Sequence, residues 1–298
     1  AQFPITSMLL VLFLGIVALA HLVPAPFVFD WASRDVSMWR VPQPPDGQTV
    51  YLTFDDGPNP EATPALLDLL ARERVRATFF LLDRHLNEQT APIVRRMAAD
   101  GHGIALHSHT RAMMLLPPDE FDRALDAAAD RIASLTGVRP CRAFRPHGAG
   151  RSLSMIAGLR QGGRRLVGWG LFLWDRDWGR ARPADRIVQR IGSRARAGSI
   201  VVMHDGHHED PRADRRYTIE ATARLVPLLR AKGLEFGTIC DVIEGAPSAR
   251  NRVRADQPAR PPASRPSRYP PTVWIEPSGS EQESGRREGH ARVCRPLF

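Results

Sequence analysis

The sequence has almost no lysine. Of its 41 basic residues only Lys232 is a lysine and the rest are arginine, and against 32 acidic residues they leave a net charge of +9. Aromatic residues make up only 7% of the chain. Scattered arginine with few aromatic residues is not typical of a nucleic-acid-binding surface, so we expect no nucleic-acid partner. The basic charge is compatible with anionic lipid or an anionic cell-wall polymer nearby.

Cysteine is scarce as well. Cys141, Cys240 and Cys294 are too few and too far apart for a disulfide framework or a zinc ribbon. Cys240 follows a strand-like run, which favours a buried apolar residue. A single bridge between Cys141 and Cys240 remains open, and no sequence pattern supports it.

Charge is absent from the N-terminal segment, where no charged residue precedes Asp30. Because about 20 apolar residues span a bilayer, we predict that residues 1–29 hold a single membrane anchor. The alternative is a cleaved signal peptide, since Ala18-Leu19-Ala20 resembles a cleavage site. The segment has neither an initiator Met nor a basic flank. In both cases we expect the following domain to be exported.

The rest of the chain divides by composition into three parts. Residues 30–48 are polar and contain proline, and we predict a connector there. Residues 49–245 alternate strand-like and helix-like segments and form the predicted domain, for which a hydrophobic content of 43% allows a substantial core. Residues 246–298 are rich in Pro, Arg and Ser, with nine prolines in 53 residues, and we predict a disordered tail.

Hydrophobic periodicity predicts the elements of this domain. Strands are expected at Val50–Phe54, Arg76–Leu82, Gly103–His107, Arg165–Trp169, Ser199–Met203 and Leu234–Ile239. Helices are expected at Thr63–Arg74, Pro92–Asp100, Asp119–Leu135, Leu153–Arg160, Pro183–Arg196 and Thr218–Lys232. Strands that alternate with helices of this length form parallel βα units. The prediction is an α/β fold, a distorted or incomplete (β/α) barrel of about seven such units.

Two adjacent carboxylates, Asp55 and Asp56, follow the first strand of this domain and precede Gly57 and Pro58. Functional residues of α/β folds gather at such strand ends. Neighbouring carboxylates repel each other, and a bound cation between them allows both to stay ionised. Asp and Gly are also ordinary turn residues, so this pair alone favours a solvated turn.

Four further polar clusters follow other strand-like runs. They are His107-Ser108-His109-Thr110-Arg111, Arg145-Pro146-His147-Gly148, Asp175-Arg176-Asp177-Trp178 and His204-Asp205-Gly206. A single histidine at a strand end is usually structural. Five polar clusters at successive strand ends converge on one face of a barrel, which indicates a site.

These motifs resemble those of the polysaccharide deacetylases, the NodB-homology family (carbohydrate esterase family 4). The resemblance covers residues 49–243. Its five motifs occur in order as Thr53–Pro58, the segment 101–108 leading into His107, Arg145-Pro146, Asp177-Trp178 and Met203-His204-Asp205. It implies hydrolytic removal of N-acetyl or O-acetyl groups from a cell-wall or extracellular polysaccharide.

The resemblance also implies a role for each matched residue. Asp55 would be the general base and His204 the general acid. Asp56 and His107 would bind a divalent metal, most often zinc. A metal polarises the amide carbonyl and keeps both carboxylates ionised, and histidine titrates near neutral pH.

Other matched residues would support this chemistry. Asp177 would tune His204, and Arg145 would orient Asp55. Trp178 and Met203 would form the walls of the acetyl pocket, and the backbone N–H near Gly148 would stabilise the oxyanion.

The second motif departs from the family pattern. Where the family has a second metal-binding histidine, this chain has Arg111, whose guanidinium cannot bind zinc. His109 is the nearest substitute, although residues i and i+2 do not share a face of a helix or turn. Alternatively, Arg111 pairs with Asp55 or Asp56 and occupies the cation site itself.

The third and fourth motifs also leave alternatives. The family's Arg-Pro-Pro-Tyr-Gly is replaced by Arg145-Pro146-His147-Gly148-Ala149. We expect His147 beside the site or at the surface rather than as a ligand, with a compensating ligand as the alternative. Asp175 ranks behind Asp177 as the partner of His204. His207 and His208 are expected on a solvated loop.

Two functions follow. The first is an exported, membrane-tethered deacetylase with a weakened or altered metal site. The second is a non-catalytic relative that binds glycan on the same face, which an Arg111–Asp56 ion pair would favour. An aspartate-dependent phosphatase fits poorly, because Lys232 is the only lysine. The sequence leaves open the polysaccharide, the metal and the oligomeric state.

Overall fold

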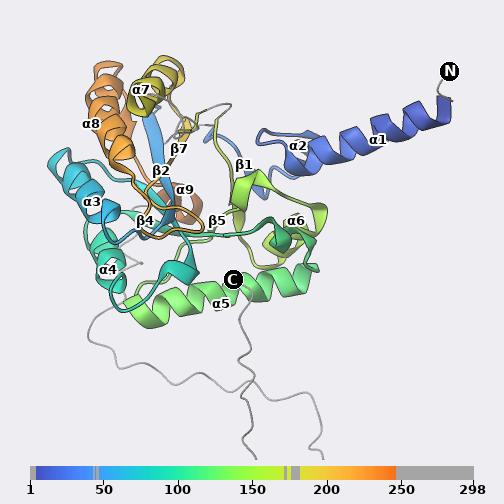
Figure 1. Ribbon diagram of the computed structural model, residues 1–298, viewed down its shortest axis with the longest axis horizontal. Coiled ribbons are helices and arrows are strands. Elements are labelled where there is room, and N and C mark those ends of the chain that lie inside the picture. The colour runs from blue at the N-terminus through green and yellow to red at the C-terminus, as the bar shows by residue number, and fades with distance from the viewer. Residues whose placement is uncertain (1–4, 43, 45–46, 171–172, 176–181, 246–298) are drawn as a thin grey trace, which may run out of the picture. The chain divides into compact units, whose positions relative to one another are not determined.

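A parallel sheet forms the centre of the protein (Figure 1). The computed structural model describes residues 5–42, 44, 47–170, 173–175 and 182–245. Its strands are β1 (Ser37–Met38), β2 (Thr49–Gly57), β3 (Thr78–Leu81), β4 (Gly103–His107), β5 (Ala143–Arg145), β6 (Arg165–Val167), β7 (Ile200–His204) and β8 (Glu235–Phe236). They are ordered β1-β6-β5-β4-β3-β2-β7, with β8 beside β2, and every pair is parallel. The result is the predicted distorted (β/α) barrel.

Helices connect these strands. They are α1 (Ile5–Leu22), α2 (Val28–Ala32), α3 (Ala62–Arg72), α4 (Ala91–Ala99), α5 (Pro118–Thr136), α6 (Leu153–Gln161), α7 (Pro183–Arg194), α8 (Arg216–Ala231) and α9 (Ile239–Glu244), with 3-10 turns η1 (Asp83–His85), η2 (Arg111–Leu115) and η3 (His147–Ala149). The six helices predicted between residues 63 and 232 are all present, with ends shifted by a few residues. Gly137 ends α5 in the left-handed conformation at φ 72°.

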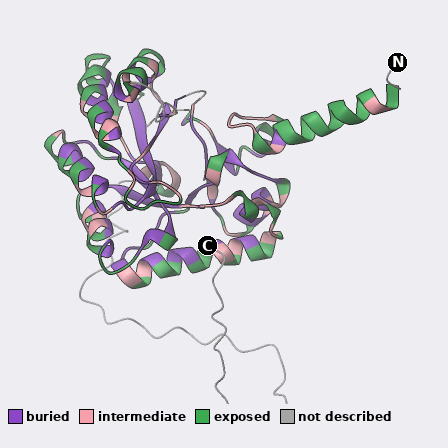
Figure 2. Cartoon of the chain, in the orientation of Figure 1, coloured by how far each residue is buried: buried purple, intermediate pink, exposed green. Residues whose placement is uncertain are grey.

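The alternation of side chains along the strands separates the core from the site. In β2, Leu52 and Phe54 belong to the large core between sheet and helices, where Phe54 stacks on Phe79 at 5.3 Å. Tyr51 and Asp55 therefore point to the other face, because successive residues of a strand face opposite sides. All nine residues of β2 are buried (Figure 2), as expected for a parallel strand covered on both faces.

Two predictions about this architecture need correction, and a third is not tested. The predicted connector contains α2 and also β1, which pairs with β6 through Ser37 and Leu166. Two residues are too few for a strand to show periodicity. The predicted last strand, Leu234–Ile239, is limited to β8, because Thr238 caps the short helix α9 by accepting a hydrogen bond from the N–H of Asp241. The predicted disordered tail, 246–298, lies outside the described residues.

A disulfide joins Cys141, which precedes β5, to Cys240 in α9. This is the bridge that the sequence left open. It lies at the start of the sheet, where the N–H of Cys141 donates to the carbonyl of Ile104 at 2.8 Å. The strand-end motifs occupy the opposite end, so the bridge supports the fold rather than the site.

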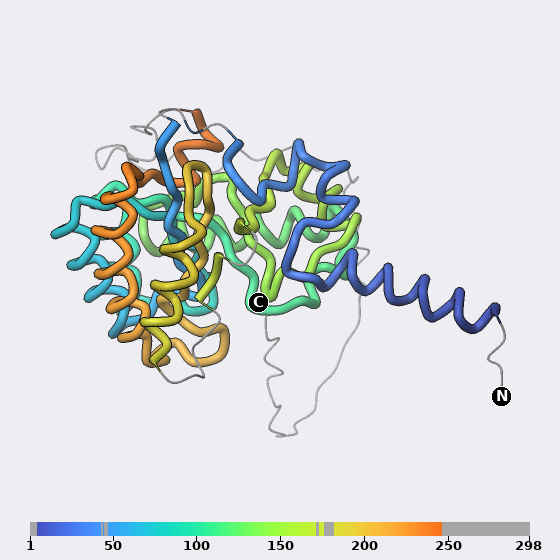
Figure 3. Tube along the Cα trace, turned by 90° about the horizontal axis from the view of Figure 1, so that it is seen from above, coloured from blue at the N-terminus to red at the C-terminus, as the bar shows by residue number. Residues whose placement is uncertain are grey.

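The helix α1 projects away from the domain (Figures 1 and 3). Its 18 residues have a mean hydropathy of 2.4, and only 6% of them are buried. By length and composition it is able to cross a membrane.

Candidate active site

Asp55 is held by a buried arginine. Arg145, at the end of β5, donates to Asp55 Oδ1 at 2.5 Å and to Thr53 Oγ1 at 2.8 Å. Its remaining donors bind the carbonyl oxygens of Val167 and Gly168 at 3.0 and 3.1 Å. The guanidinium of Arg145 is thus fixed by bonds to several groups while it holds the Asp55 carboxylate, a geometry compatible with the orienting role predicted for it.

Asp56 turns toward the neighbouring strand because β2 is irregular at this point. The pairing of β2 with β3 shifts between Asp55 and Gly57, and Asp56 has a φ of 69°, which is uncommon for a residue other than glycine. Asp56 Oδ1 lies 3.3 Å from His107 Nε2. The close approach of Gly206 accompanies this bend, since a Cβ there would lie 2.0 Å from the carbonyl oxygen of Asp56.

His107 presents one defined nitrogen to the site. Its Nδ1 lies 2.7 Å from the carbonyl oxygen of Arg145, so Nδ1 carries a proton and Nε2 faces Asp56. A backbone acceptor on one ring nitrogen is the usual support of a metal-binding histidine.

His147, rather than His109, completes a three-ligand cluster. Potential ligand atoms of Asp56, His107 and His147 all lie within 4.8 Å of one another. The backbone N–H of His147 donates to Ser108 Oγ at 3.0 Å, which ties the third motif to the second. The prediction for His109 is therefore corrected: His109 lies outside the cluster, because only His107 occupies the end of β4 and the chain then turns away.

The cluster suits a divalent metal. One carboxylate and two imidazoles are a common catalytic zinc set that leaves one coordination position open. Asp56 Oδ1 is buried and accepts no hydrogen bond of good geometry from the described residues, and it lies 3.3 Å from His107 Nε2, so both atoms face the place that a cation would take. Burial, together with the charge of His107, lowers the pKa of His147 to about 4, so His147 is neutral at pH 7 and its nitrogens are able to bind a metal.

His204 faces Asp55 from the next strand. The two residues are register partners in the pairing of β2 with β7. His204 Nδ1 donates to Asp175 Oδ1 at 2.6 Å, and its backbone N–H donates to Asp175 Oδ2 at 2.8 Å. Burial would lower the pKa of His204, but the charge and hydrogen bond of Asp175 outweigh burial and raise it to about 9. His204 is therefore protonated at neutral pH.

The resemblance to the family predicts Asp177 as the partner of His204, with Asp175 second. The structure brings Asp175 to Nδ1, whereas Asp177 and Trp178 lie outside the described residues. Asp175 is fully buried and its N–H donates to the carbonyl of Val202 at 3.1 Å. This bond sets Asp175 beside β7.

These groups open into one pocket of about 440 Å³. Its lining includes Pro24, Asp55, Asp56, His107, Arg111, Arg145, His147, Gly148, Trp169, Trp174, Val202, His204, His207 and His208. Five of the predicted site residues, Asp55, Asp56, His107, Arg145 and His204, thus meet in a single cavity. His207 and His208 lie on the loop after β7, as expected, but they are half-buried rather than fully solvated because both line this pocket, with the His147 and His208 rings 4.6 Å apart.

Comparison with known proteins decides the family. The sequence profile described as polysaccharide deacetylase matches residues 43–167. A chitooligosaccharide deacetylase of Rhizobium leguminosarum bv. trifolii is 35% identical over 206 residues, which are 65% of this chain and 91% of the relative. The chain belongs to the polysaccharide deacetylase family. It is a hydrolase that removes acetyl groups from carbohydrate.

Solved structures of polysaccharide deacetylases and related esterases share this fold. A peptidoglycan N-acetylglucosamine deacetylase bound to a hydroxybenzamide-type ligand has a TM-score of 0.60 at 27% identity, covering 71% of this chain and 94% of that one. An acetyl xylan esterase of family 4 from Clostridium thermocellum, in complex with a cobalt ion, has a TM-score of 0.57 at 30% identity, covering 67% and 93%.

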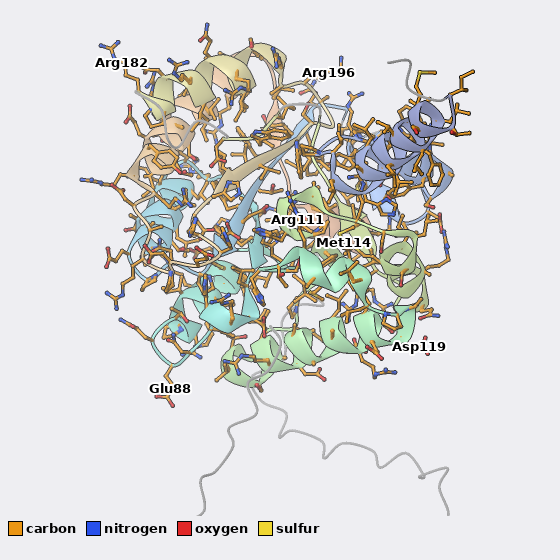
Figure 4. All side chains as sticks on the ribbon, turned by 45° about the vertical axis from the view of Figure 1, so that its right-hand side comes forward. Glu88, Arg111, Met114, Asp119, Arg182 and Arg196 are labelled. Carbon is orange, nitrogen blue, oxygen red and sulfur yellow. A yellow bond between two sulfur atoms is a disulfide. The ribbon has the colours of Figure 1, made fainter. Side chains whose placement is uncertain are left out.

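Among the described contacts, Arg111 is not bonded to the Asp56–His107–His147 cluster. Its Nη2 donates to the carbonyl oxygen of Gly148 at 3.2 Å, and Figure 4 shows Arg111 beside Met114. The described residues therefore contain no Arg111–Asp56 ion pair of the kind that would favour a non-catalytic glycan-binding relative, and that alternative is not supported.

The pocket wall differs from the prediction at Met203. Met203 is fully buried in the core and lies 3.7 Å from the Thr222 hydroxyl through its sulfur. Strand alternation points Val202 and His204 into the pocket and Met203 toward the helices. Val202, Trp169 and Trp174 form the apolar wall instead.

Proposed function

We propose that the protein is a metal-dependent deacetylase that hydrolyses the N-acetyl group of an amino sugar in a cell-wall or extracellular polysaccharide. One observation carries this proposal. The Asp56–His107–His147 cluster lies in the same pocket as Asp55 and His204, which are neighbours across two strands.

The residues divide the reaction between them. Asp55, oriented by Arg145, takes a proton from the attacking water as general base. His204, charged through Asp175, donates a proton to the leaving amine as general acid. A divalent cation held by Asp56, His107 and His147 would supply Lewis-acid polarisation of the acetyl carbonyl and a nucleophile at neutral pH. Donation from the backbone near Gly148 would stabilise the oxyanion.

Zinc is the proposed ion, because two histidines and one carboxylate match its catalytic sites. The relatives favour an N-acetylglucosamine polymer as substrate, since they are chitooligosaccharide and peptidoglycan deacetylases. An O-acetylated polysaccharide is the alternative, in line with the similar acetyl xylan esterase.

We propose that α1 anchors the domain in the membrane and that the domain is exported. The apolar, exposed α1 supports the anchor, and the Cys141–Cys240 disulfide supports an oxidising compartment. A domain released by cleavage after Ala20 is the alternative, and the mass of the exported protein distinguishes the two.

The test compares metal content and acetate release from chitooligosaccharide for the wild type, His147→Ala and a matched His109→Ala. We expect about one divalent ion per wild-type chain. Loss of a supporting residue costs 10–100-fold in metal affinity, so loss of the ligand His147 should cost about a hundredfold or more. His109→Ala should retain both metal and activity. Unchanged metal affinity in His147→Ala would contradict the assigned ligand.

A further inference from the structure

The exposed apolar side chains of this protein are concentrated around the base of α1. Outside α1, five large apolar side chains of the described residues are exposed: Val28, Trp31, Leu115, Leu153 and Leu228. Leu115 and Leu153 are the most prominent of those outside the N-terminal segment, at 80% and 62% exposure. The first four are called the apolar rim below.

The two leucines of the apolar rim belong to adjoining segments. Ser152 and Ser154, which flank Leu153, donate to the carbonyl oxygens of Met114 and Leu116, which flank Leu115, each at 2.6 Å. These bonds place the two exposed leucines on adjoining segments, where η2 meets the start of α6.

Arg151 joins this surface to the chain that leaves α1. Its fully buried guanidinium binds Asp30, with Nη2 2.7 Å from Oδ2. It also donates to the carbonyl oxygens of Val23 and Ala25 at 2.7 and 2.5 Å. Its backbone N–H donates to the carbonyl of His21 at 3.0 Å. The segment 21–30 is therefore built into the domain and is not a loose linker.

Val28 and Trp31 complete the apolar rim from α2. They are three residues apart and so share one face of this helix, whereas Asp30 points inward to Arg151. Tryptophan is enriched at the boundary between lipid and water. The exposed Arg34 and Arg111 lie next to α2 and at the start of η2, where they suit anionic headgroups.

The pocket begins within two residues of the end of α1. An α-helix of 18 residues is about 27 Å long, close to the hydrocarbon thickness of about 30 Å, so Leu22 reaches the hydrocarbon boundary when α1 spans. Pro24 lines the pocket, and two residues extend at most about 7 Å. The headgroup layer has a similar depth. The Pro24 wall of the pocket therefore lies at the lipid surface.

We propose that the apolar rim rests on the bilayer and opens the active site at the lipid surface, so that the substrate is an acetylated glycan carried on a lipid in the same leaflet. This inference rests on the proposed anchor and the proposed deacetylation. A rigid attachment of this kind selects substrates held at the same height and disfavours a polymer far from the membrane.

The experiment uses the full chain in vesicles of phosphatidylcholine and phosphatidylglycerol. The first measurement is tryptophan quenching by lipids brominated near the headgroup. We expect quenching in the wild type and a reduced quenched fraction in Trp31→Phe. Equal quenching of the two proteins overturns the contact of the apolar rim with the bilayer.

The second measurement compares acetate release from chitotetraose on an embedded alkyl chain and from free chitotetraose. In Leu115→Ser/Leu153→Ser we expect the ratio of the two rates to fall by about fivefold or more, because the variant loses apolar contact with lipid. Leu228→Ser on α8, far from α1 in Figures 1 and 3, is the matched control and should keep the wild-type ratio.

The outcomes separate the two proposals. An unchanged ratio in the double variant overturns the lipid-carried substrate. A wild type that releases acetate from neither glycan contradicts the proposed N-deacetylation, while the quenching measurement still tests the apolar rim.

Discussion

Asp175 determines the charge of the proposed general acid. It receives two hydrogen bonds from His204, one from Nδ1 and one from the backbone N–H. The bond to Nδ1 fixes the orientation of the ring, and the bond from the N–H holds Asp175 against β7. The carboxylate also keeps the pKa of His204 at about 9, above its usual value of 6.5. A general acid must carry its proton, so this pKa should limit activity on the alkaline side.

Asp175→Asn should move that limit. Without the carboxylate, burial lowers the pKa of His204, and the alkaline limb of kcat against pH should shift to lower pH by about one unit or more. The exposed Asp214 pairs with Arg216, so Asp214→Asn is a control that should keep the wild-type profile. An alkaline limb unchanged in Asp175→Asn would exclude His204 with Asp175 as the titrating pair.

Sequence patterns located some site residues and missed others for identifiable reasons. Asp55, Arg145 and His204 sit at strand ends inside recognisable motifs, so their convergence was predictable. His147 was ranked below His109 because proximity in sequence favoured His109, while the Ser108–His147 hydrogen bond that joins two strands is a tertiary contact. The prediction that Met203 lines the pocket is wrong. Met203 and His204 are consecutive residues of one strand, so their side chains face opposite sides of the sheet, and this could be read from the sequence.

At the scale of elements, the buried Arg151–Asp30 pair fastens α2 and the end of α1 to the loop before α6. Both side chains are inaccessible to solvent, and the arginine donors are used by Asp30 and by carbonyl oxygens of Val23, Ala25 and Ala149. Removing the carboxylate leaves a buried charge without its counterion.

Asp30→Asn should therefore destabilise the fold strongly. Breaking a buried pair costs about 3–5 kcal/mol, which urea unfolding in detergent would detect. The matched control is Asp35→Asn, because Asp35 pairs with Arg160 at 2.8 Å on the surface and such exposed pairs contribute about 1 kcal/mol or less. If both variants lose the same free energy of unfolding, the buried Arg151–Asp30 pair contributes no more to stability than the exposed pair.

The elements that sequence analysis missed are the short ones. Long helices such as α5 carry enough apolar repeats to be recognised. Gly137 also marks the C-terminal end of α5 in the sequence. β1 has two residues and α9 has six, too few for either periodicity to appear. Both owe their conformation to partners distant in sequence, β1 to β6 and α9 to the sheet through Cys240.

At the scale of the whole molecule, the disulfide closes a large loop at the end of the sheet remote from the pocket. Its cysteines are 99 residues apart. Cross-linking such a loop limits the unfolded chain and contributes to stability.

Cys141→Ser/Cys240→Ser should lower the free energy of unfolding by about 2–5 kcal/mol. The specific activity of the folded fraction should be unchanged, because the bridge does not line the pocket. Cys294→Ser is the control and should leave the stability unchanged. A double variant as stable as the wild type, or one that is folded but inactive, would disagree with this view.

The register between β2 and β7 bears on how the substrate specificity of such an enzyme changes. Asp55 and His204 are direct partners in that pairing, so the backbones that carry the proposed base and acid lie one strand spacing apart, about 4.8 Å. Backbone hydrogen bonds between β2 and β7 maintain this spacing when the sequence or length of the surrounding loops changes. Insertions in the loops around the pocket are therefore able to change which glycan binds, while the proposed base and acid keep their positions on the two strands.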